Sequence, residues 1–142
     1  VVLLGRGETP PAGPLPAADP REAWLHAPST GLRATWLGHS SVRVEIDGAR
    51  VLTDPVFGKR ASPSQLAGPK RFHPVPVGIK HLLPLDAVLI SHDHYDHLDH
   101  ATVRALARGG ASFVTSLGVG AAMESWGIPP ERIACVALRI TL

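Results

Sequence analysis

The 142-residue sequence contains one cysteine, so no disulfide bond can form within the chain. Aromatic residues contribute only 5%, and no apolar run approaches the roughly 20 residues that a membrane-spanning helix needs. The net charge of +2 is too small to indicate a nucleic-acid partner. With 44% hydrophobic residues, the chain is long enough for one globular domain with a core, which we expect to act in the cytoplasm.

Histidine and aspartate are both absent after residue 100, where Glu124 and Glu131 are the only acidic residues. By contrast, four of the eight histidines and three aspartates fall within residues 91–100. The side chains best suited to chemistry are therefore concentrated in one short segment.

The core of that segment is the pattern His-x-His-x-Asp-His, formed by His92, His94, Asp96 and His97. Imidazole nitrogens and carboxylate oxygens are the ligands that zinc takes when no thiolates are offered. His92 and His94 are two residues apart in an extended segment, so they point to one side and can bind one ion. Asp96 and His97 follow a turn and can reach a second ion. The alternative, a polar loop that faces water, is disfavoured by this spacing directly after a buried strand.

The flanking residues predict a strand before the motif and a helix after it. Residues 86–90 form a short apolar run with β-branched side chains, which is typical of a buried strand. Asp99 is the expected N-cap of a helix over residues 100–108, which ends at two glycines. The ligands would therefore leave the C-terminal end of a strand, where open α/β sheets place their sites.

Three strands precede the motif, at residues 33–38, 41–46 and 50–53. An Asp-Gly tight turn at residues 47–48 joins the second to the third. Together they predict an antiparallel meander with one buried face. The middle strand alternates between aliphatic side chains on one side and charged ones on the other: Val42, Val44 and Ile46, against Arg43 and Glu45.

After the motif, residues 112–115 and 132–136 are typical of strands, and residues 117–126 of a helix. The βαβαβ order predicts parallel strands with the helices on one face. Residues 1–31 are rich in proline and predict an irregular arm with at most one helical turn, at 21–26. The rest of the chain, residues 32–142, forms the expected domain.

A long segment between the meander and the motif, residues 55–85, carries basic but no acidic residues. Lys59, Arg60, Lys70 and Arg71 belong to it. Beside a metal site, such a loop would favour an anionic substrate or an anionic lipid surface. The alternative is a charged loop that only faces solvent.

Five blocks of the sequence carry a resemblance to a known family: TWLGHS at 35–40, LTDP at 52–55, RASPS at 60–64, GPKRF at 68–72 and ISHDHYDHLD at 90–99. They resemble the metallo-β-lactamase superfamily, and within it the branch that contains N-acyl-phosphatidylethanolamine-hydrolysing phospholipase D. The resemblance implies an α+β fold, the first half of a four-layer αββα sandwich, with an antiparallel meander followed by βαβαβ. It also implies two zinc ions in the complete site.

By the same resemblance, complete members carry a third histidine, a bridging aspartate and a last histidine downstream of the motif. Since no histidine or aspartate follows residue 100, we expect residues 32–142 to be a truncated domain. A chain that supplies two ligands to each ion would bind zinc weakly and turn over little.

Three further residues have supporting roles in this interpretation. Asp54 would lie beneath the metal cluster and hydrogen-bond a ligand histidine, and its backbone should be extended because Pro55 follows it. His39 would lie in a loop near the site, and Asp93 would orient a histidine or a water molecule. For Asp54 and His39, the alternative is an ordinary turn residue.

The sequence thus predicts a zinc-dependent hydrolase with Asp96 as a catalytic residue. A phosphodiesterase or phospholipase D-like activity on an anionic small molecule or a phospholipid fits best, with peripheral contact to a membrane surface through the basic loop. No added basic or aromatic-rich domain supports nucleic-acid binding. Two alternatives stay open: a lactonase- or thioesterase-type hydrolase of the same fold, and a catalytically inactive metal-binding fragment.

Overall fold

The computed structural model describes residues 13, 15–60, 62, 66, 68, 70–71 and 73–137. Expectations for residues 1–12, 14 and 138–142 lie outside these described residues. Within them, the chain forms three 3₁₀ turns, two helices and one six-stranded sheet. The elements in chain order are η1 (Ala23–Leu25), β1 (Leu32–Gly38), β2 (Ser41–Ile46), β3 (Ala49–Thr53), η2 (Ile79–His81), β4 (Ala87–Ile90), α1 (His100–Arg108), β5 (Phe113–Ser116), α2 (Val119–Ser125), η3 (Pro130–Arg132) and β6 (Ile133–Val136).

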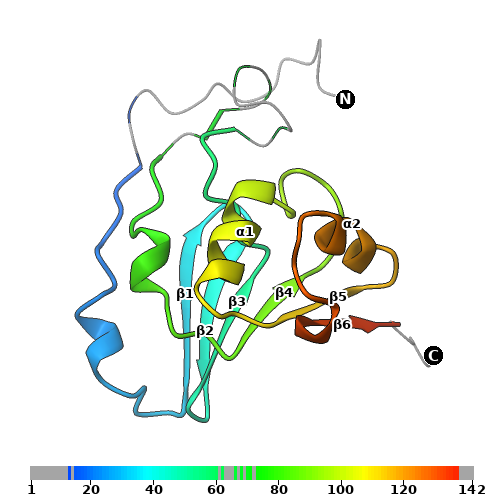
Figure 1. The fold of residues 1–142 in the computed structure, drawn as a ribbon. Helices are drawn as coiled ribbons and strands as arrows, with labels where there is room; N and C mark the ends of the chain where they lie inside the picture. The colour runs from blue at the N-terminus through cyan, green and yellow to red at the C-terminus, as the bar shows by residue number, and fades with distance from the viewer. Residues whose placement is uncertain are drawn as a thin grey trace, which may run out of the picture.

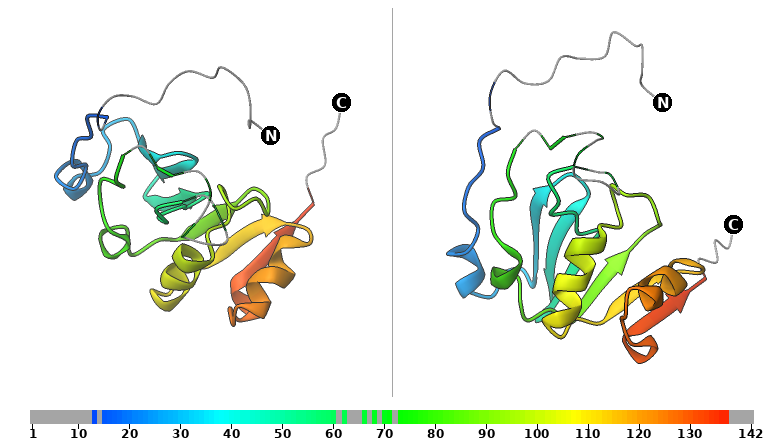
Figure 2. Two further views of the ribbon diagram at one scale, coloured as in Figure 1. Left: turned by 90° about the horizontal axis from the view of Figure 1, so that it is seen from above. Right: turned by 45° about the horizontal axis from the view of Figure 1, so that its top comes forward.

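The strands lie side by side in chain order, from β1 to β6. β1, β2 and β3 pair antiparallel, whereas β3, β4, β5 and β6 pair parallel. Both helices cover the same face of the sheet (Figures 1 and 2). The predicted α+β fold, an antiparallel meander followed by βαβαβ, is therefore confirmed.

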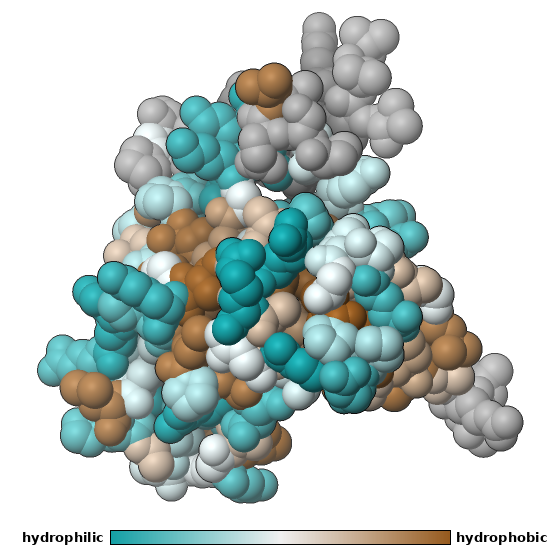
Figure 3. Space-filling view, viewed as in Figure 1, coloured by the Kyte–Doolittle hydropathy of each residue, from teal (hydrophilic) through white to brown (hydrophobic). Residues whose placement is uncertain are grey.

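The hydrophobic core lies between the parallel strands and the two helices. Val88 and Phe113 point from the sheet towards Val103 and Leu106 of α1 and Met123 of α2, and all are almost fully buried. The outer side of α1 is hydrophilic, with hydrophobic side chains on both sides of the helix (Figure 3). This core fixes β4 and α1, and so it fixes the two ends of the motif loop between them.

The meander buries the opposite side from the one that its sequence alternation favours. Arg43 and Glu45 are only 4% and 7% exposed, whereas Ile46 on the aliphatic side is 44% exposed. The reason is a tertiary contact, because the N-terminal arm packs over the charged side of β2. Arg43 and Glu45 form an ion pair of 2.7 Å beneath it.

The arm is held to the meander by Trp24 in η1. The guanidinium carbon of Arg43 lies 4.3 Å from the centroid of the Trp24 ring, a cation–π contact. The indole Nε1 donates a hydrogen bond of 3.1 Å to Thr35 Oγ1 on β1. η1 lies where the sequence predicts one turn, and it is the only regular element in the described part of the arm.

The sheet face opposite the helices is apolar and is not covered by the described part of the chain. One row of register partners crosses all six strands on this face: Trp36, Val42, Thr53, Leu89, Val114 and Ala134. Apolar surface in water is unfavourable by about 25 cal/mol per Å². A second layer packed on this face would remove that cost, which agrees with a sheet from one half of a sandwich. No helix among the described residues has the length and apolar composition to cross a bilayer.

We expect Trp24→Ala to lower the free energy of unfolding by about 1–3 kcal/mol, because it removes the ring over Arg43 and the hydrogen bond to Thr35. Leu25→Ala is the matched control: Leu25 is 78% exposed, so its truncation should cost less than about 0.5 kcal/mol. Urea unfolding followed by circular dichroism measures both. Equal stability of the two variants would show that Trp24 does not hold the arm to the meander.

Candidate metal centre

The candidate ligands meet at one edge of the sheet because three strands end there. β1 and β3 are each antiparallel to β2, and β3 is parallel to β4, so β1, β3 and β4 run in the same direction. His39 directly follows β1, Asp54 follows β3 and residues 91–97 follow β4. The C-terminal ends of these strands therefore bring together residues that are far apart in the sequence.

Among the described residues, His39, Asp96 and His97 form a group whose ligand atoms all lie within 4.8 Å of one another. Asp96 Oδ2 is 3.3 Å from His39 Nε2 and 3.8 Å from His97 Nε2. Ligand atoms at about 2.0–2.1 Å from one tetrahedral ion are separated by about 3.4 Å. Small side-chain adjustments would place all three around one ion, so this donor set fits a divalent metal.

Asp54 fixes the orientation of His97. Its Oδ2 lies 3.0 Å from His97 Nδ1, and its two oxygens accept hydrogen bonds from Ser91 N (2.7 Å) and Ser91 Oγ (2.8 Å). An ionised carboxylate can only accept, so Nδ1 of His97 carries the proton and Nε2 keeps its lone pair. Nε2 is the atom whose distance to Asp96 is 3.8 Å, so the histidine presents the correct nitrogen to a metal ion.

The backbone of Asp54 is left-handed, with φ of +37°, so the expectation of an extended conformation is wrong. This conformation is disfavoured for most residues, although aspartate tolerates it better than others. Asp54 N donates to Leu89 O at 2.8 Å, and Asp54 O accepts from Ser40 Oγ (3.2 Å) and Ser41 Oγ (3.0 Å). These tertiary hydrogen bonds outweigh the local preference that Pro55 imposes.

Ser91 connects Asp54 to a second histidine. Its hydroxyl proton goes to Asp54 Oδ2, so the hydroxyl accepts from His92 Nδ1, which lies 2.8 Å away. The Nε2 of His92 then keeps its lone pair as well. Sequence reasoning did not single out Ser91, and its place next to His92 was the one available signal.

The rings of the motif histidines gather together. The centroid of the His92 ring lies 4.6 Å from that of His94 and 4.1 Å from that of His97. Within the part of the chain that the structure describes, neither His92 nor His94 belongs to the tight group of three ligand atoms. The two halves of the motif are therefore neighbours with different surroundings.

A turn returns Asp96 and His97 towards β1. His94 O accepts hydrogen bonds from His97 N (2.9 Å) and Leu98 N (2.7 Å). Ser40 Oγ donates to Asp96 O at 2.9 Å, which joins this turn to the connection between β1 and β2. The same connection carries His39, and this explains how His39 reaches Asp96.

Asp96 supplies the negative charge of the group. Its partial burial would raise its pKa, but the hydrogen bond from His39 and the nearby charges of His97 and His39 lower the pKa below its usual value. Asp96 is therefore ionised at neutral pH and suited to bind a cation.

The remaining predicted residues lie in different surroundings. The sequence interpretation gave His39 only a supporting role near the site, whereas in the structure His39 belongs to the group of three potential ligands. Its backbone is left-handed, with φ of +52°. The Gly-His-Ser turn at the end of a strand was the signal for it. Asp93 is exposed and lies outside the group of three. Asp99 caps α1 as predicted, accepting from Ala101 N at 3.2 Å.

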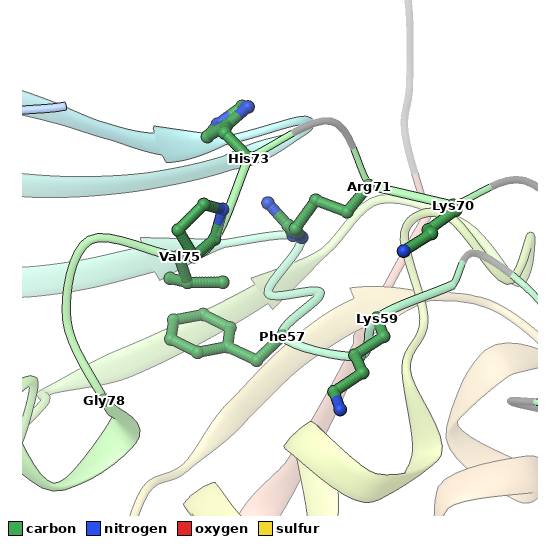
Figure 4. A pocket seen from close by; sticks show the side chains of 9 residues that line it. Phe57, Lys59, Lys70, Arg71, His73, Val75 and Gly78 are labelled. Carbon is green, nitrogen blue, oxygen red and sulfur yellow. The ribbon is translucent and has the colours of Figure 1, made fainter. Parts of the chain in front are cut away.

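The basic loop is closed at its base. Arg60 and Lys70 form an isolated antiparallel bridge, and Arg71 N donates to Lys59 O at 3.0 Å. Lys59 and Lys70 are exposed, whereas Arg60 and Arg71 are half-buried. Three of the four predicted basic residues, all except Arg60, line one pocket (Figure 4).

Residues 49–141 match the family described as the beta-lactamase superfamily domain. An uncharacterised protein of Mycobacterium tuberculosis is 52% identical over 124 residues, which are 87% of this chain and 33% of that protein. N-acyl-phosphatidylethanolamine-hydrolyzing phospholipase D 1 of Caenorhabditis elegans is 49% identical over 77 residues, which are 54% of this chain and 22% of that protein. A metal-dependent hydrolase of Methanopyrus kandleri is 34% identical over 97 residues, 68% of this chain and 36% of that protein.

The chain spans about a third of the length of the first of these relatives. Among solved structures, the isothiocyanate hydrolase from Delia radicum gut bacteria superposes with a TM-score of 0.58 at 26% identity. The match covers 73% of this chain and 40% of that one. The similarity in sequence and in structure therefore extends over most of this chain and a minor part of each relative.

We expect Asp54→Ala to lower the free energy of unfolding by about 2–4 kcal/mol, because alanine is disfavoured at a positive φ and Ser91 N loses its acceptor. Asp54→Asn suits the backbone and keeps an acceptor oxygen, so it should cost less than half as much. Urea unfolding of the two variants beside the wild type gives the comparison. Equal losses of stability would mean that the negative charge of Asp54, rather than its backbone conformation and its hydrogen bonds, stabilises this part of the protein.

Proposed function

Because this chain belongs to the beta-lactamase superfamily domain family, we propose that it carries part of the active site of a metal-dependent hydrolase. The observation that supports this most is the group of His39, Asp96 and His97, whose ligand atoms lie within 4.8 Å of one another. We assign these three residues to one metal ion, and His92 and His94 to a neighbouring one. Zinc suits this set of nitrogen and oxygen donors.

The chain's own residues have distinct roles in this proposal. A bound metal ion would polarise the bond to be broken and lower the pKa of water to about 7. Asp96 would contribute the negative charge that holds the cation. His97 would contribute the lone pair of Nε2, and His39 would contribute its Nε2 once that nitrogen has lost the proton that it shares with Asp96. Asp54 holds the proton of His97 on Nδ1, and Ser91 does the same for His92. These two residues keep both imidazoles oriented before a metal arrives.

For the substrate, we propose a phosphodiester, such as that of a phospholipid. The name of the nematode relative describes a phospholipase D that acts on such a lipid. Lys59, Lys70 and Arg71 add positive charge on the loop that follows Asp54 and so favour an anionic substrate.

A second candidate is a hydrolase of the same fold that acts on an electrophilic carbon, as in a lactone or a thioester. The likeness to an isothiocyanate hydrolase favours it, because an isothiocyanate contains an electrophilic carbon and no phosphorus. A third candidate is a metal-binding chain without activity.

We expect His39→Ala and His97→Ala each to weaken cobalt or zinc binding by at least about tenfold, because each removes a proposed ligand. His81→Ala, at an exposed histidine in η2, is the matched control and should leave the affinity unchanged. Isothermal titration with zinc and the visible absorption of bound cobalt both report on binding. Unchanged affinity in His39→Ala would remove His39 from the ligand set.

Activity is tested with the purified protein on a phosphodiester, an N-acylphosphatidylethanolamine, a lactone and a thioester. We expect phosphodiester hydrolysis that is lost with a chelator and restored by zinc, and a loss of at least about 100-fold in kcat for Asp96→Ala. Zinc-restored hydrolysis of only the lactone or the thioester would favour the second candidate. Metal binding without any turnover would favour the third.

A further inference from the structure

A pocket of about 520 Å³ lies at the base of the basic loop. Phe57 and Val75 give it an apolar wall, while Lys59, Lys70 and Arg71 give it positive charge, and none of the described residues that line it is acidic. Figure 4 shows the guanidinium of Arg71 reaching towards Phe57 and Val75. The pocket is thus apolar on one side and cationic on the other.

Arg71 is the part of the pocket that most requires an anion. Its Nη2 donates a hydrogen bond to Val56 O. Its Nη1 is buried and has no hydrogen-bond partner among the described residues. Burial lowers the pKa of Arg71 and Asp99 opposes this, yet an arginine keeps its charge at neutral pH. A buried charged donor without an acceptor is unfavourable, and an anion in the adjoining pocket would offset the charge of this guanidinium.

His73 adds a second buried nitrogen without a partner. Its Nδ1 is buried and also lacks a partner within the described part of the chain. Its ring is held in place by Trp36, with the two centroids 5.5 Å apart. Two buried nitrogens from one short segment therefore lack a hydrogen-bond partner within the described part of the chain.

Two residues that line the pocket, Arg71 and His73, also lie beside Gly38 at the end of β1. A Cβ atom on Gly38 would lie 2.7 Å from both Arg71 Nη1 and His73 Nε2, so a larger residue at this position would displace these side chains. Gly38 is directly followed by His39, a proposed metal ligand. A group that is bound by Arg71 would therefore lie next to the strand end that carries this ligand.

The wall of the pocket is held by the residue that caps α1. Asp99 Oδ2 accepts hydrogen bonds from Phe57 N (3.2 Å) and Gly58 N (2.8 Å). On the other side, Arg71 N donates to Lys59 O at 3.0 Å. Because hydrogen bonds already hold both sides of the pocket, little conformational entropy of these segments would be lost when a ligand binds.

We propose that this pocket binds the phosphate group of a phosphodiester, with an apolar substituent of the same molecule against Phe57 and Val75. This inference rests on the proposed function, because it gives a binding position to the substrate class named there. Phosphate oxygens suit the planar guanidinium of Arg71 together with the ammonium groups of Lys59 and Lys70. The apolar wall distinguishes a phospholipid from free phosphate, which makes no use of it.

The test is isothermal titration in the presence of EDTA, with inorganic phosphate and with dihexanoylphosphatidylethanolamine below its micellar concentration. We expect the lipid to bind at least fivefold more tightly than phosphate. Arg71→Gln should weaken both probes roughly tenfold, because it removes the buried charge. Val75→Thr should weaken only the lipid, roughly threefold, because it makes the wall polar. Lys80→Gln removes a charge outside the pocket and should leave both affinities within twofold.

Circular dichroism checks that each variant is folded. If Arg71→Gln is not, Lys70→Gln at an exposed position takes its place, with a loss of roughly threefold for both probes. Undiminished binding of both probes in these variants, or an equal loss of affinity in Lys80→Gln, would show that this pocket does not bind the phosphate group. Equal affinity for the two probes would overturn the apolar part of the inference. Since EDTA excludes metal, these results are independent of the metal titrations that test the proposed function.

Discussion

The carboxylate of Asp54 is the contact on which the candidate site depends. It lies at the end of β3 and binds Ser91 at the end of β4 through both of its oxygens. It also faces His97 Nδ1 directly, and it reaches His92 through the Ser91 hydroxyl. Its carbonyl accepts from Ser40 and Ser41, at the start of β2. One residue in a left-handed conformation thus joins three strand ends, and the rigidity of the sheet is transmitted to the imidazoles.

Local patterns in the sequence were sufficient for most of the fold. α1 has the predicted bounds, because its N-cap Asp99 and the glycines after Arg108 are signals within the helix's own neighbourhood. β2 also has the predicted bounds, since its alternation and the following turn are local. The other strands and α2 differ by one or two residues at their ends, where hydrogen bonding frays. The spacing of the motif was likewise local information, and it located the candidate site.

What the sequence left open depends on contacts between distant residues. His39 is 57 positions away from Asp96, and no periodicity links the two. The meander buries the charged side of β2 rather than its aliphatic side, because Trp24 of the arm covers Arg43. The backbone of Asp54 follows from its partners on β4 and in the β1–β2 turn rather than from Pro55. In each case a tertiary contact outweighs a local preference, and such contacts concentrate where the site is.

The order of the strands in the sheet also bears on how the candidate site forms during folding. Each strand pairs with the one synthesised just before it, so no strand has to wait for a distant partner. The contacts described around the candidate ligands join residues 39–97, all of which precede α1. On the ribosome, the histidines could be aligned before α2 and β6 emerge, while the apolar sheet face is still bare. A nascent chain at that stage would have an ordered polar edge beside an exposed apolar surface, and such a surface is prone to aggregate.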